Sequence, residues 1–172
     1  MNDKDIQEIK PDSSFKFEIV GTSEGKTALW CVQCGMCSSN CPYSDTWEIK
    51  PHQVISMIQL GMRDKVLNSK SIWICATCYM CAERCPQGVE IANVMFALKN
   101  IATKEKGIPE GYRLFSQQVY NTGHGAEITT LRERERARMG LPKVPEVNIK
   151  SIRRLLKKTK LAKFIDKKED KQ

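Results

Sequence analysis

The eight cysteines of this 172-residue chain fall into two runs that share one spacing, Cys-x2-Cys-x2-Cys-x3-Cys-Pro. The first run consists of Cys31, Cys34, Cys37, Cys41 and Pro42, and the second of Cys75, Cys78, Cys81, Cys85 and Pro86. No cysteine lies outside the two runs. The repeated spacing therefore predicts two sites of the same kind, both built from cysteine.

This spacing is the bacterial-type run of ligands for cubane iron–sulfur clusters, in which three close cysteines bind one cluster and the fourth binds the other. The sequence thus predicts two [4Fe–4S] clusters and a role in electron transfer. The predicted ligands are Cys31, Cys34, Cys37 and Cys85 for cluster 1, and Cys75, Cys78, Cys81 and Cys41 for cluster 2.

A continuous helix cannot place these cysteines around a cubane, because positions i, i+3, i+6 and i+10 all lie on one side of it. We therefore expect the first three cysteines of each run to lie on a curled loop, where small residues let backbone amides approach the cluster. Pro42 and Pro86 suit the first position of a helix, which would place Cys41 and Cys85 at a change of chain direction.

Structural zinc and a disulfide framework are two other uses of eight cysteines. Zinc sites usually take paired ligands from two separated places, whereas four cysteines fall together here and a proline follows each set. Residues 1–12 are polar and lack the apolar region of a signal peptide, which argues against the oxidising compartment that disulfides need. Both alternatives fit the chain less well than iron–sulfur ligation.

Five other side chains near the cysteine runs or between glycines are of interest. Trp30, Trp47 and Trp73 flank the runs, and their burial would shield the clusters from water. His52 begins a helix and is expected to face solvent. His124 lies between two glycines, and we expect it in a tight turn packed near a cluster or a partner.

Helical periodicity dominates the rest of the chain. Apolar residues recur at helical spacing in residues 52–61, 89–101, 112–120 and 149–164, a charged run at 131–139 is also expected to be helical, and Phe15 to Val20 alternates like a short strand. The predicted fold is mainly α, a helical ferredoxin-like dicluster domain with additional C-terminal helices. Its predicted parts are an N-terminal extension (1–24), the two-cluster domain (25–107), a helical partner-contact region (108–148) and a basic amphipathic tail (149–172).

The formal charge of +8 belongs mainly to the tail. Between residues 150 and 168, nine Lys and Arg stand against the single acid Asp166, so the residues before 150 sum to about +1. The apolar face of the tail would consist of Ile149, Ile152, Leu155, Leu156 and Phe164. We expect this helix to dock on a partner protein, with a frayed, solvated tail as the alternative, and we expect no nucleic acid partner.

No apolar run approaches the roughly 18 residues that span a bilayer, so a cytoplasmic protein without a transmembrane segment is expected. Glu133 with Arg136, and Glu135 with Arg138, are spaced to form i,i+3 ion pairs on a solvated helix. The chain has no G-x-G-x-x-G after a strand, no P-loop and only two histidines. We therefore predict no catalytic residue in this chain.

The cysteine runs and their aromatic surroundings resemble those of the C subunit of heterodisulfide reductase. The resemblance rests on Trp30 to Cys37, Trp73 to Cys81, the helix between them and the segment Asn121-Thr-Gly-His-Gly125. It covers roughly residues 25–140 and both runs without a missing ligand. The spacing alone would also fit other helical ferredoxin domains, such as those of succinate dehydrogenase iron–sulfur subunits.

The resemblance implies a non-catalytic electron-relay subunit of a cytoplasmic oxidoreductase complex. In that family, the A subunit, which carries FAD and iron–sulfur clusters, delivers electrons after flavin-based bifurcation. The B subunit reduces a disulfide, the coenzyme M–coenzyme B heterodisulfide of methanogenesis, at noncubane clusters, and the larger complex can include a hydrogenase or formate dehydrogenase. The alternative is a free-standing dicluster ferredoxin, or the iron–sulfur subunit of another oxidoreductase of sulfur metabolism or of dehydrogenase type.

Overall fold

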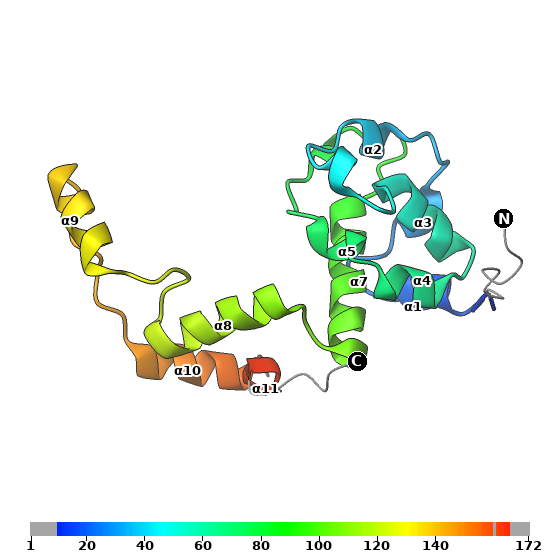
Figure 1. Ribbon diagram of the computed structural model, residues 1–172. Helices are drawn as coiled ribbons and strands as arrows, with labels where there is room; N and C mark the ends of the chain where they lie inside the picture. The colour runs from blue at the N-terminus through cyan, green and yellow to red at the C-terminus, as the bar shows by residue number, and fades with distance from the viewer. Residues whose placement is uncertain (1–9, 160, 166–172) are drawn as a thin grey trace, which may run out of the picture. The chain divides into compact units, whose positions relative to one another are not determined.

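The computed structural model describes residues 10–159 and 161–165. They form two compact units, one ending at Lys106 and the other beginning at Gly107. Helices and turns make up both units, and the described ranges contain no strand (Figure 1). The prediction of a mainly α fold with additional C-terminal helices is confirmed. Within the same ranges, no helix is long and apolar enough to cross a membrane.

The first unit is built around its longest helix, α7. Its elements are α1 (Phe15–Val20), the 3-10 turn η2 (Ala28–Trp30), α2 (Met36–Ser39), the 3-10 turn η3 (Ser44–Thr46), α3 (Pro51–Gln59), α4 (Arg63–Asn68), α5 (Ser71–Ile74), α6 (Met80–Glu83) and α7 (Ile91–Lys106). Helices α1, α4, α5 and α6 all contact α7 (Figure 1). The long connection between the two cysteine runs is therefore helical, and it closes the core on α7.

Helix α7 buries the apolar stripe that the sequence predicts. Val89, Ile91, Val94, Met95, Leu98 and Ile101 are each no more than 7% exposed. The helix ends before Gly107, whose φ of 88° lies in the left-handed region that glycine adopts without strain. Burying this stripe supplies the main apolar wall beneath the second cysteine run.

Helix α3 begins with Pro51, whose missing N–H costs nothing at a first helical position. The Gln53 side chain accepts a hydrogen bond of 2.9 Å from the backbone N–H of Lys50, which closes the first turn. The helix ends at Gln59, two residues before Gly61, which has a φ of 73°. The Gly61 carbonyl accepts a 2.8 Å hydrogen bond from the backbone N–H of Asp12, so this stop also anchors the N-terminal segment.

Residues 15–20 form helix α1, so the prediction of a short strand is wrong. The alternation of Phe15, Phe17 and Ile19 suggested one buried face, yet Phe17 is 63% exposed while Phe15 and Ile19 are fully buried. Phe15 and Ile19 are four residues apart, which places both on the same face of a helix. The segment buries this pair against the core without needing a partner strand.

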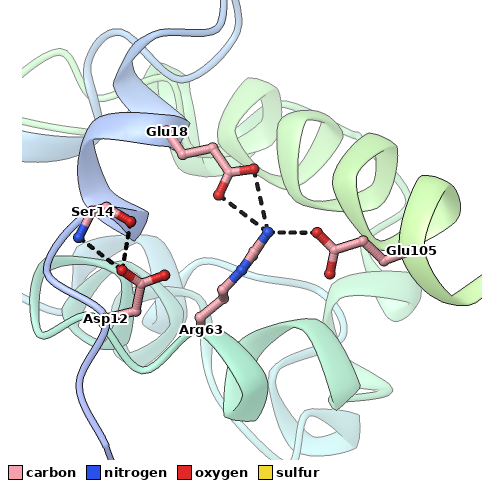
Figure 2. A network of polar contacts seen from close by, with 5 residues as sticks. All are labelled: Asp12, Ser14, Glu18, Arg63 and Glu105. Carbon is pink, nitrogen blue, oxygen red and sulfur yellow. Dashed lines mark hydrogen bonds and ion pairs between the residues drawn. The ribbon is translucent and has the colours of Figure 1, made fainter.

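Arg63 joins three helices of this unit through charge pairing, as Figure 2 shows. Its guanidinium lies 3.2 Å from Glu18 of α1 and 2.5 Å from Glu105 of α7. The same group lies 5.3 Å from the centre of the Phe15 ring. At the start of α1, Asp12 accepts two hydrogen bonds from Ser14, whose hydroxyl is the main cause of a lowered Asp12 pKa.

The second unit contains α8 (Glu110–Thr122), α9 (Thr130–Arg138), α10 (Ile149–Lys158) and α11 (Ala162–Ile165). Helices α10 and α11 pack against α8 (Figure 1). Ile152 and Leu156 of α10 are partly buried, as predicted. Leu155 was predicted to lie on the same packed face, but it is 61% exposed. The side chain of Phe164, which the sequence assigns to that face, lies outside the described residues.

A glycine turn closes α8 within this unit. Gly123 ends the helix with a φ of 78°, and a Cβ on it would lie 3.0 Å from the Val147 side chain. A Cβ on Gly125 would lie 2.7 Å from the ring of Phe115, so both glycines permit close packing. His124 is therefore held in a packed turn of the second unit.

Helix α9 is exposed to solvent along almost its whole length. In the described part of the chain, neither Glu133 nor Glu135 forms the ion pair with Arg136 or Arg138 that their spacing predicts. Arg136 instead donates a 2.8 Å hydrogen bond to the Pro142 carbonyl. Arg136 is partly buried, and the other charged side chains of this helix are exposed to solvent.

Candidate functional site

The two cysteine loops have the same backbone conformation. Two residues of each loop have positive φ at matching positions, Gln33 (58°) and Gly35 (78°) in the first loop and Thr77 (56°) and Tyr79 (61°) in the second. Left-handed residues placed among ordinary ones turn successive backbone N–H groups toward one side and create a concave site for an anion. The predicted curled loops are confirmed for the first two cysteines of each run, whereas the third lies on a short helix. The loops suit a cluster whose thiolate-bound form is negatively charged.

The third cysteine of each run lies on a one-turn helix. Cys37 belongs to α2 and Cys81 to α6, and these two helices pack against each other. Gly35 and Tyr79 precede them in the left-handed conformation, so each loop turns sharply into its helix. Packing of α2 on α6 brings the two runs together although they are separated by a helical segment.

The prolines do not begin helices, which corrects the prediction for Pro42 and Pro86. Each follows its cysteine in a tight turn, since the Cys41 carbonyl accepts from the Ser44 N–H at 3.0 Å and the Cys85 carbonyl from the Gly88 N–H at 3.1 Å. Proline fits the second position of such a turn because its φ is already fixed there. The predicted change of chain direction at both cysteines is confirmed, by turns in place of helix starts.

One cavity of the first unit is lined by cysteines of both runs. Cys41 of the first run lines it together with Cys75, Cys78 and Cys81 of the second. These are the four ligands predicted for cluster 2. Its other walls include Tyr43 and Trp47 beyond the first run, residues 76–80 of the second loop, and Pro51, Ile91, Ala92 and Met95. The cavity thus combines four thiols with a mostly apolar wall.

Burial raises the pKa of three cysteine thiols, those of Cys37, Cys75 and Cys81. It raises the pKa of Cys37 and of Cys81 to about 11. Burial is also the main cause of the raised pKa of Cys75, to which the negative charges of Cys41 and Cys78 contribute. Cys41 and Cys75 line the same cavity. Ligation requires thiolates, so metal binding here must displace protons.

The four cysteine thiols suit a cubane cluster better than a single metal ion, both in their chemistry and in their separation. Within the described residues, no three His, Cys, Asp or Glu side chains lie close enough together to hold one metal ion. A cubane separates its ligands more widely, because each cysteine binds a different iron of the cube. Four thiols around a mostly apolar cavity provide such a site.

The three tryptophans differ in their contribution to shielding. Trp47 is 7% exposed and lines the cavity, whereas Trp30 is 57% exposed. Trp73 is partly buried against the core. The shielding prediction therefore holds for Trp47, is partly met by Trp73, and is wrong for Trp30.

His52 is partly buried, which corrects the expectation that it faces solvent. Its ring Nδ1 lies 2.7 Å from the hydroxyl of Ser38, and its backbone N–H donates to the same hydroxyl at 3.1 Å. Ser38 is next to Cys37 on α2. His52 therefore fixes the first turn of α3 against the helix that carries a predicted ligand.

Sequence reasoning missed two side chains that bind the backbone of the loops. Gln59 donates a hydrogen bond of 3.2 Å to the Cys31 carbonyl, and Lys99 donates one of 2.8 Å to the Cys75 carbonyl. Each carbonyl belongs to the first cysteine of its run. No local pattern could predict these bonds, because the partners lie 28 and 24 residues apart in the chain.

Comparison with known proteins agrees with this site. Residues 27–89 match the family described as a 4Fe-4S dicluster domain. The chain is 33% identical to the iron-sulfur C subunit of the CoB–CoM heterodisulfide reductase of Methanopyrus kandleri, over 78% of this chain and 73% of the relative. It is also 33% identical to the iron-sulfur C subunit 2 of the same enzyme from Methanocaldococcus jannaschii, over 86% of this chain and 82% of the relative.

A third relative, from Methanosarcina acetivorans, is named as the C subunit of a ferredoxin/F420H2-dependent CoB–CoM heterodisulfide reductase. It is 29% identical over 85% of this chain and 94% of the relative. The similarity thus extends well beyond the cysteine runs into the second unit.

Proposed function

Since the chain belongs to the family of heterodisulfide reductase C subunits, we propose that it relays electrons inside such a complex from a flavin-containing A subunit to a disulfide-reducing B subunit. The observation that carries this proposal is the pair of equivalent cysteine loops, joined by the packing of α2 on α6 within one unit. Two cluster sites held this close are suited to passing single electrons. The chain offers one site for entry and one for exit.

The bound clusters supply one-electron chemistry, because each accepts or releases an electron without breaking a bond to its ligands. The residues of this chain hold and tune them. The cysteines would anchor the irons, the backbone amides of the two loops would stabilise negative charge, and Trp47 with Met95 would help to exclude water from the cavity.

We propose the crossed ligand sets predicted from the spacing, with Cys85 completing cluster 1 and Cys41 completing cluster 2. The shared cavity of Cys41, Cys75, Cys78 and Cys81 supports the second set. The first set would consist of Cys31, Cys34, Cys37 and Cys85. Crossed ligation ties each loop to the turn that follows the other, so both clusters would stabilise the packing of α2 on α6.

The disulfide chemistry would belong to a partner. All eight cysteines of the chain lie in the two runs, so none remains to hold a further cluster or to attack a disulfide. The relatives' names refer to the coenzyme B–coenzyme M heterodisulfide, and we propose the same class of substrate for the complex that contains this chain. A hydrogenase or formate dehydrogenase is proposed as a further member of that complex, which would work in the cytoplasm.

We further propose that the second unit docks on an acidic surface of a partner protein. All five Lys and Arg of α10 are exposed, and α10 contains no acidic residue. Arg153 donates a 3.0 Å hydrogen bond to the Tyr120 carbonyl of α8, and Ile152 and Leu156 are partly buried, so the other four charges remain for a partner. Charge complementarity of this kind mainly steers association and fixes orientation.

Anaerobic purification of the tagged chain from its native host, followed by mass spectrometry of the proteins that copurify, tests the proposed function. An untagged strain provides the control for nonspecific recovery. We expect a flavoprotein and a protein rich in cysteine motifs for noncubane clusters. Recovery of the chain alone, with both clusters intact, would contradict the relay proposal and favour a mobile dicluster ferredoxin.

A further inference from the structure

The two loops differ in charge at one equivalent position. The carbonyl of the first cysteine accepts a side-chain hydrogen bond in both loops, from the amide of Gln59 at Cys31 and from the ammonium of Lys99 at Cys75. The loops share their backbone conformation, so these two donors occupy matching places. One donor is neutral and the other carries a positive charge.

Lys99 lies on the side of α7 that faces the second site. It follows Met95 by one helical turn, and Met95 lines the cavity that contains Cys75, Cys78 and Cys81. The Lys99 side chain is partly buried. Its ammonium is thus held near the second loop by both the helix and the 2.8 Å bond to the Cys75 carbonyl.

The charge of Lys99 has no carboxylate partner among the described residues. Its other close neighbour is the ring of Phe96, whose centre lies 5.8 Å from Nζ. A partly buried cation without a counter-ion is costly. A negatively charged cluster on Cys75 would supply the missing opposite charge.

We propose that Lys99 raises the reduction potential of the site held by Cys75, Cys78 and Cys81 above that of the site held by Cys31, Cys34 and Cys37, and so sets the direction of electron flow. The inference rests on the proposed function. One electron leaves the first-loop site, which is oxidised, and enters the second-loop site, which is reduced. No bond forms or breaks, and no proton is transferred.

The physical reason is the charge of the reduced state. Reduction adds one negative charge to a site, and a nearby fixed cation stabilises that added charge more than a neutral amide does. Partial burial strengthens this effect because water screens the charge less.

In the first loop, hydrogen bonds to a cysteine sulfur also favour the reduced state, but their effect is weaker than that of the Lys99 charge. The Gln33 backbone and side chain both donate to the Cys31 sulfur, at 3.4 and 3.3 Å. Hydrogen bonds to a ligand sulfur also raise a cluster potential. However, Gln33 is exposed and neutral, and hydrogen bonds from ionised donors are roughly twice as strong as neutral ones. The difference between the loops therefore favours the second site as the electron acceptor.

Redox titration of the full-length chain in its purified complex, followed by EPR, tests this inference. The two signals are first assigned with Cys34→Ser and Cys78→Ser, which alter the exposed central cysteine of one loop each. Lys99→Gln keeps a donor for the Cys75 carbonyl and removes the charge. We expect it to lower the equilibrium constant for reducing the second site about tenfold, a fall of about 59 mV for one electron, with the first site unchanged.

Two further variants separate charge from structure. Lys99→Arg retains the cation and should retain the potential, whereas Gln59→Lys adds a cation to the first loop and should raise the potential of the first site. Unchanged potentials in Lys99→Gln and Gln59→Lys, with both EPR signals intact, would overturn the inference and leave the proposed function standing. Absence of two cluster signals from the wild-type chain would instead overturn the proposed function.

Discussion

At the scale of single residues, Gly61 shows how backbone conformation and contact act together. Its φ of 73° strains any residue with a Cβ, and a Cβ there would overlap the backbone of Asp12. We predict that Gly61→Ala destabilises the first unit by at least about 2 kcal/mol, since the left-handed conformation alone costs about 1–2 kcal/mol. Anaerobic thermal unfolding of the cluster-loaded chain measures the effect.

Gly107→Ala is the matched control for this substitution. Gly107 also has a positive φ, of 88°, but a Cβ there would meet nothing within 4 Å. Gly107→Ala should lower the free energy of unfolding only by the cost of the left-handed conformation, about 1–2 kcal/mol. Equal losses in the two variants would show that the contact of Gly61 with Asp12 contributes nothing.

Cys41 tests the crossed ligand sets. We predict that Cys41→Ser perturbs the EPR signal of the cluster bound by Cys75, Cys78 and Cys81, because the four thiols share a cavity. The matched variant Cys85→Ser should perturb the other signal. If Cys41→Ser instead alters the cluster of its own run and leaves the second unchanged, the crossed assignment is wrong.

Local spacing predicted the cysteine sites because consecutive ligands within a run constrain one another. The curled loops and the change of chain direction at each fourth cysteine could be predicted in this way, although Pro42 and Pro86 lie in tight turns and do not begin helices. The hydrogen bonds of Gln59 and Lys99 to the loops could not, because they depend on how α3 and α7 pack. The solvent-facing expectation for His52 failed for the same reason, since its partner Ser38 is 14 residues away in the chain.

At the scale of elements, α1 depends on its contacts with the rest of the unit. Its six residues are too few for a stable isolated helix, so tertiary packing must hold it. The buried pair Phe15 and Ile19 supplies this packing, and Arg63 adds the charge contacts of Figure 2. The alternation that suggested a strand could not reveal it, because both patterns place residues 15 and 19 on one face.

Arg63 should contribute modestly to stability because its ion pairs reach solvent. The Glu18 and Glu105 side chains are 41% and 40% exposed, so we predict a loss of about 1 kcal/mol for Arg63→Met and about 0.5 kcal/mol for Glu18→Gln. Both losses should shrink at high salt. Urea unfolding of the cluster-loaded chain measures them, and a loss of about 3–5 kcal/mol for Arg63→Met would indicate a fully buried ion pair instead.

At the scale of the whole molecule, the chain joins a cluster-bearing unit to a basic helical unit. Helices α8 and α10 of the second unit could be predicted from apolar periodicity, whereas α9 could be predicted from its run of alternating charges. The exposure of Leu155 could not, since the sequence does not show how much of the α10 stripe α8 covers. We propose that the first unit binds the clusters and the second docks on a partner. The contribution of the α10 charges to docking is therefore best measured in the assembled complex.

We predict that the triple variant Arg154→Gln, Lys157→Gln and Lys158→Gln slows assembly with the partner proteins and reduces its dependence on salt, because these exposed charges lack acidic neighbours on α10. Stopped-flow or surface-binding measurements at several salt concentrations provide the rates. The matched control removes three exposed lysines of the first unit, Lys26, Lys65 and Lys70. Equal slowing in both variants would mean that net charge alone matters and that α10 is not a specific docking surface.

Rapid-freeze EPR of the purified complex tests the relay directly. The complex is reduced anaerobically, mixed with the heterodisulfide and frozen at intervals shorter than one turnover. We predict that both clusters of this chain lose their electrons at least as fast as the complex forms thiol product. Clusters that remain reduced while product accumulates would contradict a relay through this chain.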